Sequence, residues 1–193
     1  MDDDDTFHGL TNFIFFEMSE PSKYPEAPSL VSLIIPIYNE AEHLESFLHG
    51  IDQLELPLKK ELIIVDDCSS DSSRDIVDNF QFTSAIKFIK QPVNQGKGAA
   101  LRTGIEQATG DIIGIQDADF EYDITDIAKL LHPFIEGKAD IVFGSRFKNG
   151  VLVYRTFHYL VNKFLTSISN LMSGLYLSDM DTCYKFFKKD IIK

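Results

Sequence analysis

Four carboxylates follow an apolar run at every second position of one stretch, GDIIGIQDADFEYDI (residues 110–124). They are Asp117, Asp119, Glu121 and Asp123. In an extended chain, side chains two residues apart share a face, so the first three could converge. Converging carboxylates repel unless a cation lies between them, and oxygen ligands favour a hard cation, Mg²⁺ or Mn²⁺. The spacing therefore predicts a divalent-cation site, and a solvated acidic turn is the alternative.

Two other segments bear on this interpretation. Asp66 and Asp67 end a second apolar run, ELIIVDD (61–67), which would reach the same edge of a parallel sheet. NQGKGAAL (94–101) lacks the full pattern of a P-loop or of GxGxxG. Its Gly96 and Gly98 still permit an anion at a helix N-terminus, with Lys97 adding charge. A plain tight turn is an equally good interpretation of that motif alone.

The elements that must position these residues alternate along the chain. Short β-branched runs predict strands at 30–37, 61–67, 85–90, 111–117 and 140–145. Amphipathic or capped segments predict helices at 40–51, 69–80, 96–108 and 125–136, the last kinked or interrupted near Pro133. This alternation predicts an α/β fold with a mainly parallel sheet and helices on both faces. Ligands bind such sheets beyond the carboxyl ends of the strands, where PIYNE, VDDCSSD, QDADFE and GSRF stand.

Length and charge limit the classes of function. The 193 residues are 44% hydrophobic, which suits one domain, and the net charge of −12 argues against a nucleic-acid binder. Residues 151–193 nevertheless carry six Lys/Arg against three Asp, which indicates an anionic partner for this segment or random variation. Cys68 and Cys183 form no disulfide or zinc pattern, so we expect a reducing compartment.

The N-terminal residues 1–28 are predicted to be a loosely specified arm. Asp2–Asp5 make its start acidic, unlike a signal peptide, and prolines follow. The segment LTNFIFFEM within it is apolar enough to dock. No apolar run in the sequence reaches the roughly 18 residues of a membrane-spanning helix.

Taken together, four segments resemble the GT-A glycosyltransferases of family 2: SLIIPIYNEAEHLESFL, ELIIVDDCSSDSSRDIV, NQGKGAALRTGIEQATGDIIGIQDADFEYDITDI and ADIVFGSRF. The polyprenyl-phosphate branch, with dolichol-phosphate mannose synthases and dolichyl-phosphate glucosyltransferases, is the most similar. The late stretch NKFLTSISNLMSGLYLSDMDTCYKFFKKDI resembles it too. The resemblance implies a GT-A catalytic domain over residues 29–193, with an acceptor and membrane-proximal segment at about 151–193. Relatives often continue further, some into membrane helices.

The resemblance also implies roles for individual residues. Nucleotide-sugar contacts would come from Pro36, Tyr38, Glu40, Val65, Asp67, Lys97, Asp117, Ala118, Asp119, Arg146 and Arg155. Asp119 and Arg146 would be catalytic, Asp119 by holding Mg²⁺ or Mn²⁺ and Arg146 by meeting phosphates. Glu121 would be a second metal ligand, although many relatives have Gln there, and this departure puts the metal preference in doubt.

The implied reaction is an inverting transfer of a sugar from a GDP- or UDP-sugar to a polyprenyl phosphate. A phosphate monoester is largely ionised already, because its second pKa is near 6, so no strong general base is needed. We expect a cytoplasmic protein that is peripheral on a membrane, with residues 154–177 as an interfacial helix or an ordinary core helix. The alternatives are a family 2 transferase with a polysaccharide or other glycan acceptor, a sugar nucleotidyltransferase, and a non-catalytic nucleotide-sugar-binding domain. The sequence does not indicate an oligomeric state.

Overall fold

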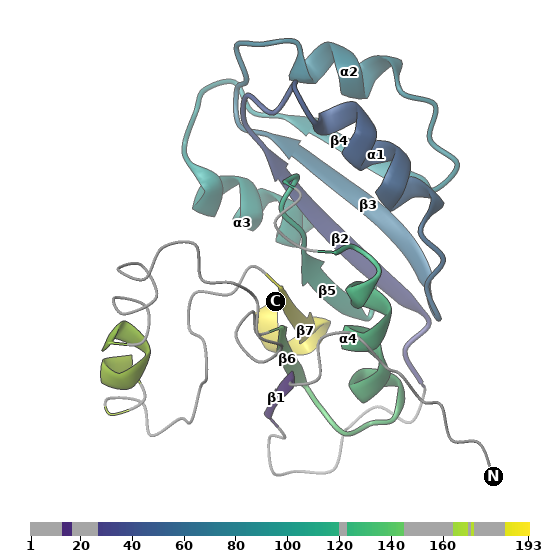
Figure 1. Ribbon diagram of the computed structural model, residues 1–193, viewed down its shortest axis with the longest axis vertical. Helices are drawn as coiled ribbons and strands as arrows, with labels where there is room; N and C mark the ends of the chain where they lie inside the picture. The colour runs from purple at the N-terminus through teal and green to yellow at the C-terminus, as the bar shows by residue number, and fades with distance from the viewer. Residues whose placement is uncertain (1–12, 17–26, 120–122, 145–163, 170, 172–183) are drawn as a thin grey trace, which may run out of the picture.

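The computed structural model describes residues 13–16, 27–119, 123–144, 164–169, 171 and 184–193. Its strands are β1 Phe13–Phe16, β2 Leu30–Ile37, β3 Lys59–Asp66, β4 Ala85–Lys90, β5 Ile112–Ile115, β6 Ile141–Gly144 and β7 Lys185–Lys188. The helices with defined bounds are α1 Leu44–Gln53, α2 Ser73–Asn79, α3 Lys97–Gln107, α4 Asp126–Ile135 and α6 Lys189–Ile192. The strands of these residues form one sheet in the order β1-β6-β7-β5-β2-β3-β4 (Figure 1).

Most of the sheet runs in one direction. β2 pairs in parallel with both β3 and β5, and β4 pairs in parallel with β3. β7 lies antiparallel between β5 and β6, so β6 again points the same way as β5. β1 is antiparallel to β6 at the edge. The predicted α/β fold with a mainly parallel sheet is therefore confirmed.

Helices cover both faces of the sheet, and each face has its own core. Leu33, Ile35 and Ile37 of β2 belong to the larger core, which also takes in the apolar faces of α1 and α4. The intervening Ile34 belongs to the second core, under α3. Successive side chains of a strand point to opposite faces, so a strand buried on both needs an unbroken apolar run. Figure 1 shows α1 and α2 on one side of the sheet and α3 on the other.

Several boundaries differ from the prediction. β2 and β4 have the predicted ends, whereas β5 stops at Ile115 and α1 begins only at Leu44. Pro133 does not interrupt α4, which continues to Ile135. Pro133 has no N–H to donate to the carbonyl four residues earlier, so the helix continues past it with that one bond missing. β1 and β7 were not predicted, and β1 gives the apolar N-terminal segment a place on the sheet.

The segment predicted as an interfacial helix, 154–177, lies mostly outside the described residues. Residues 164–169 are helical, and Phe164 and Leu165 have 65% and 46% of their surface exposed, while Thr166 is buried. Among the residues that the structure describes, no helix has both the length and the hydropathy needed to cross a membrane.

Candidate active site

A cavity of about 240 Å³ opens beyond the carboxyl ends of β2, β3 and β5. It lies where β2 has β3 on one side and β5 on the other, which is the point of an α/β sheet where ligands bind. Its lining residues come from four connections: Pro36, Ile37, Tyr38, Glu40, Asp67, Asn94, Gly96, Lys97, Ala100, Asp117, Ala118 and Asp119.

Most of the predicted nucleotide-sugar contacts line this one cavity. Val65 does not, because it is fully buried in β3 and packs in the core under α3. Glu121, Arg146 and Arg155 lie outside the described residues. Sequence reasoning did not assign three lining residues, Ile37, Asn94 and Ala100. They lie within the quoted segments PIYNE and NQGKGAAL, but none has a charged side chain that would indicate a ligand contact.

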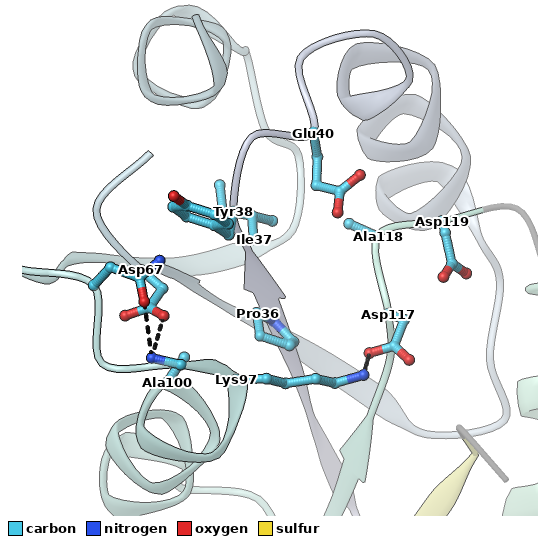
Figure 2. A pocket seen from close by; sticks show the side chains of 12 residues that line it. Pro36, Ile37, Tyr38, Glu40, Asp67, Lys97, Ala100, Asp117, Ala118 and Asp119 are labelled. Atoms are coloured by element: carbon cyan, nitrogen blue, oxygen red, sulfur yellow. Dashed lines mark hydrogen bonds and ion pairs between the residues drawn. The ribbon is translucent and has the colours of Figure 1, made fainter. Parts of the chain in front are cut away.

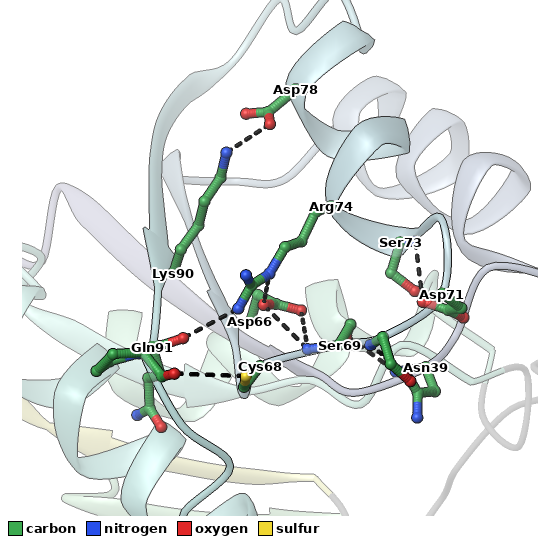
Figure 3. Close-up of polar contacts among 12 residues, drawn as sticks. Asn39, Asp66, Cys68, Ser69, Asp71, Ser73, Arg74, Asp78, Lys90 and Gln91 are labelled. Carbon is green, nitrogen blue, oxygen red and sulfur yellow. Dashed lines mark hydrogen bonds and ion pairs between the residues drawn. The ribbon is translucent and has the colours of Figure 1, made fainter.

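Hydrogen bonds join the loop after β2 to the loop after β3. Asn39 has φ of 56°, a left-handed conformation that Asn adopts more readily than most residues. Its side-chain oxygen accepts a bond from the Ser70 N–H at 2.8 Å, and its own N–H donates to the Ser69 hydroxyl at 3.0 Å (Figure 3). The next N–H, of Glu40, donates to the Ser73 hydroxyl at 2.9 Å. These bonds hold Tyr38 and Glu40 at the rim of the cavity.

Asp66 and Asp67 have different partners although they are adjacent. Asp66 is fully buried and pairs with the Arg74 guanidinium, which also donates to the Gln91 carbonyl (Figure 3). Asp67 faces the cavity, where its two oxygens accept the N–H groups of Gln95 at 2.8 Å and Gly96 at 2.6 Å. Asp66 is therefore a structural residue, and Asp67 fixes the loop that leads into α3.

Helix α3 begins at the cavity without a side-chain cap. Gly96 precedes it with φ of 86° and ψ of 160°, a conformation that is nearly restricted to glycine. Three lysines donate hydrogen bonds to backbone carbonyls at the carboxyl end of α3. Lys87 donates to the carbonyl of Gln107, Lys189 to that of Thr109 and Lys193 to that of Ala108. The positive end of the helix dipole is therefore directed at the cavity, where it favours an anion.

The carboxylates after β5 do not continue a strand. Because β5 ends at Ile115, Asp117 and Asp119 lie in the non-strand segment after it, which bends at Asp119, instead of alternating along a strand. Figure 2 shows both on the same side of the cavity as Glu40, away from Tyr38 and Asp67. Burial raises the pKa of Glu40, and the negative charges of Asp119, Asp71 and Asp117 raise it further.

The residues of this cavity fit a divalent cation that also takes ligands from water or from a bound phosphate. Within the described ranges, no three His, Cys, Asp or Glu side chains are grouped closely enough to hold a metal by themselves. Asp117 and Asp119 offer oxygen ligands only. Burial is the main cause of the raised pKa of Glu40, and a cation would relieve the smaller part that comes from the charges of Asp119 and Asp117. Mg²⁺ and Mn²⁺ suit such a set, because waters and phosphate oxygens complete their coordination.

Comparison with known families accounts for this arrangement. The family described as Glycosyl transferase family 2 matches residues 32–193, which is most of the chain. This chain is a family 2 glycosyltransferase. The glycosyltransferase is 30% identical to a UDP-N-acetylglucosamine–dolichyl-phosphate N-acetylglucosaminyltransferase of Methanococcus voltae, over 86% of this chain and 72% of that protein.

Two further likenesses are partial. The glycosyltransferase is 34% identical to a dolichol-phosphate mannosyltransferase of Pyrococcus furiosus over 62% of its own length, but the match spans only 34% of that relative. A solved glucosyl-3-phosphoglycerate synthase of Mycobacterium tuberculosis, in complex with Mn²⁺, UDP and glucosyl-3-phosphoglycerate, superposes with a TM-score of 0.61. The superposition covers 85% of this chain and 58% of that one at 20% identity, so the likeness concerns the fold.

Proposed function

We propose that this glycosyltransferase moves a sugar from a UDP- or GDP-sugar to a polyprenyl phosphate, with inversion at the anomeric carbon and with Mg²⁺ or Mn²⁺. The observation that carries the donor half is the cavity at the sheet's switch point, where Lys97, Asp117 and Asp119 meet beside the start of α3. The acceptor half is supported by the M. voltae relative, whose name includes dolichyl phosphate and which aligns over most of both chains.

The nucleoside part of the donor would occupy the side of the cavity formed by Tyr38 and Asp67. Tyr38 is about half exposed at the rim, so its ring is available to contact a base. Asp67 keeps lone pairs free beyond the two backbone bonds it accepts, which permits a further bond to a ribose hydroxyl or a base N–H. This division leaves the opposite side of the cavity for the diphosphate and the sugar.

The residues on that opposite side are charged and would bind the cation and the phosphates. Asp119 and Glu121 would hold the cation, and Asp117 would offer it a further oxygen. When bound, the cation would stabilise the charge that develops on the leaving nucleoside diphosphate. Lys97 and the N-terminal end of α3 would face the same phosphates, and Arg146 is proposed to join them. Because the acceptor phosphate is already ionised, these residues need only to orient it in line and exclude water.

The acceptor would reach the site from a membrane, so we propose that the enzyme works at a membrane surface. The exposed Phe164, Leu165 and Ile168 of residues 164–169 support this placement, because apolar side chains can enter the boundary of a bilayer. The net positive charge of residues 151–193 supports an anionic surface or an anionic acceptor there.

The test is a panel of UDP- and GDP-sugars incubated with the protein, Mn²⁺ and a short polyprenyl phosphate. We expect a glycosyl-phosphoryl-polyprenol identified by mass, with an anomeric configuration opposite to that of the donor. A second acceptor arm uses β-1,6-linked N-acetyl-D-glucosamine oligosaccharides. The reason is a poly-β-1,6-N-acetyl-D-glucosamine synthase of Staphylococcus epidermidis that is 38% identical over 89 residues, which are 46% of this chain and 21% of that relative. Transfer to the oligosaccharide without transfer to the lipid phosphate would replace the proposed acceptor.

A further inference from the structure

An ion pair crosses the floor of the cavity. The Lys97 ammonium lies 2.6 Å from Oδ1 of Asp117, and in Figure 2 the extended lysine side chain runs below Pro36 to reach it. Lys97 has 55% of its side chain exposed, whereas Asp117 has 11%. Of the described residues that line the cavity, Lys97 is the only one with a basic side chain. Asp117, one of the carboxylates proposed for the divalent cation, is therefore already paired with a half-exposed ammonium group of the protein itself.

We propose that Lys97 is a positioning residue that couples the binding of the divalent cation to the binding of the donor diphosphate, by competing with the cation for Asp117. This inference rests on the proposed function and adds to it a thermodynamic coupling between the two ligands and the residue that produces this coupling. Without a diphosphate, a divalent cation that approaches Asp117 must displace the ammonium group, so the cation alone binds weakly. With a diphosphate present, Lys97 has a second anion to pair with.

The geometry allows Lys97 to change partners. Its Cα is in the first turn of α3, directly after Gly96, so its side chain starts where the helix dipole favours a phosphate. A lysine has a flexible four-carbon stem and a compact charge, so it can turn from one oxygen to another without moving the helix. Asp117 cannot follow it, because its side chain is largely buried and its own carbonyl accepts a 2.7 Å bond from the Gln116 side chain.

The consequence is positive cooperativity between the two ligands. A diphosphate that draws Lys97 away frees Asp117 for the cation, and a cation on Asp117 frees Lys97 for the diphosphate. By linkage, each ligand must raise the affinity for the other by the same factor. A lysine that served only to hold the fold together would change neither affinity in this reciprocal way.

The experiment measures Mn²⁺ affinity with and without nucleotide, by the electron paramagnetic resonance signal of free Mn²⁺. The nucleotide is UDP or GDP, whichever the wild-type protein binds more tightly. The variants are Lys97→Met, which keeps the stem and removes the charge, and Lys97→Arg, which keeps the charge. The matched control is Lys129→Met, which removes a lysine paired with Asp126 at 2.8 Å within α4, outside the cavity lining. Thermal melting confirms that each variant is folded.

We expect Lys97→Met to bind Mn²⁺ alone about two- to fivefold more tightly, the factor that corresponds to one ion pair with an exposed partner. We expect the same variant to bind the nucleoside diphosphate with Mn²⁺ about tenfold more weakly, because a charged hydrogen bond to phosphate is lost. The coupling factor between Mn²⁺ and nucleotide should therefore fall to the part that direct contact between the cation and the phosphate oxygens supplies. Lys97→Arg and Lys129→Met should keep it.

Two results separate this inference from the proposed function. If wild type binds Mn²⁺ and nucleotide with a coupling factor that Lys97→Met retains, the inference is wrong and the proposed function stands. If wild type binds neither UDP nor GDP in the presence of Mn²⁺, the proposed donor site is wrong and the inference is overturned with it. Tighter binding of Mn²⁺ alone together with weaker binding of nucleotide, in Lys97→Met only, supports both.

Discussion

Replacing Asp67 with Asn exchanges one side-chain oxygen for an NH₂ group and leaves the shape of the side chain unchanged. Asp67 is 3% exposed, and its two oxygens accept the N–H groups of Gln95 and Gly96. Asn has a single oxygen, so one of these N–H groups would face a second donor. Losing such a bond to a buried group costs about 1–3 kcal/mol. For a chain of this size, that cost lowers the melting temperature by roughly 2–12 °C.

The variant should also lose affinity for the nucleotide, because the bonds of Asp67 hold the loop that positions Gly96 and Lys97. We expect UDP or GDP, with Mn²⁺, to bind about tenfold more weakly, which corresponds to about 1.4 kcal/mol. The assay is isothermal titration calorimetry at a temperature well below every melting transition. Binding is compared with melting because a general loss of stability must be separated from a local effect on the site.

Asp52→Asn is the matched control. Asp52 is likewise buried, at 6% exposure, and accepts bonds from the N–H groups of Thr83 and Ser84, both at 2.9 Å. It does not line the cavity. Asp52→Asn should therefore lower the melting temperature by a similar amount and leave nucleotide affinity within about twofold. Equal nucleotide affinity in the two variants would refute the positioning role of Asp67, and a wild-type melting temperature in Asp67→Asn would refute the energetic argument.

Three other outcomes are expected. Asp119→Asn should abolish transfer and weaken Mn²⁺-dependent nucleotide binding. Its melting temperature should be unchanged or slightly raised, because the substitution relieves repulsion around Glu40. Normal turnover of the variant would contradict this prediction. Burial raises the pKa of Asp52, but bonds from Thr83 and Ser84 outweigh it and lower the pKa to about 2. The stability that Asp52 contributes is therefore present above pH about 4 and lost towards pH 2. Urea titrations of the wild-type protein should show this loss as roughly 2 kcal/mol of unfolding free energy. The Asp52→Asn variant should not show the loss. Gly114→Ala should lower the melting temperature by roughly 2–12 °C, because its Cβ would stand 2.2 Å from the Phe186 ring.

The sequence predicts the parallel half of the fold well, for a physical reason. β2 and β4 have the predicted ends because a strand covered on both faces needs an apolar run, and polar residues end that run where the chain leaves the sheet. β7 escaped prediction because its sequence, KFFK, lacks the β-branched residues of β5 and β6, and because its partners lie more than 40 residues earlier in the chain. Short strands that depend on distant partners leave little local signal.

The sequence indicated which segments line the candidate cavity but not the contacts within it. Motif positions indicated that the segments after β2, β3 and β5 would gather at one edge, and they line one cavity. Adjacent carboxylates cannot be told apart by composition, so the division between a buried Asp66 and a cavity-facing Asp67 needed the structure. The Lys97–Asp117 pair joins residues 20 positions apart on different elements, and no periodicity in the sequence connects them.

The position of β7 has a consequence for how the chain reaches its fold during synthesis. β2, β3, β4 and β5 can pair with one another as they emerge, because β3, β4 and β5 each lie beside a strand already made. β6 emerges before β7, but β7 lies between β6 and β5 in the sheet. Phe187 of β7 is paired with Ile113 of β5 on one side and with Ile141 of β6 on the other. Until β7 arrives, the nascent sheet exposes an open edge at β5, and β6 with β1 remains detached. Chaperones should therefore remain bound to the nascent chain until residues 185–188 have left the ribosome and have paired with β5 and β6.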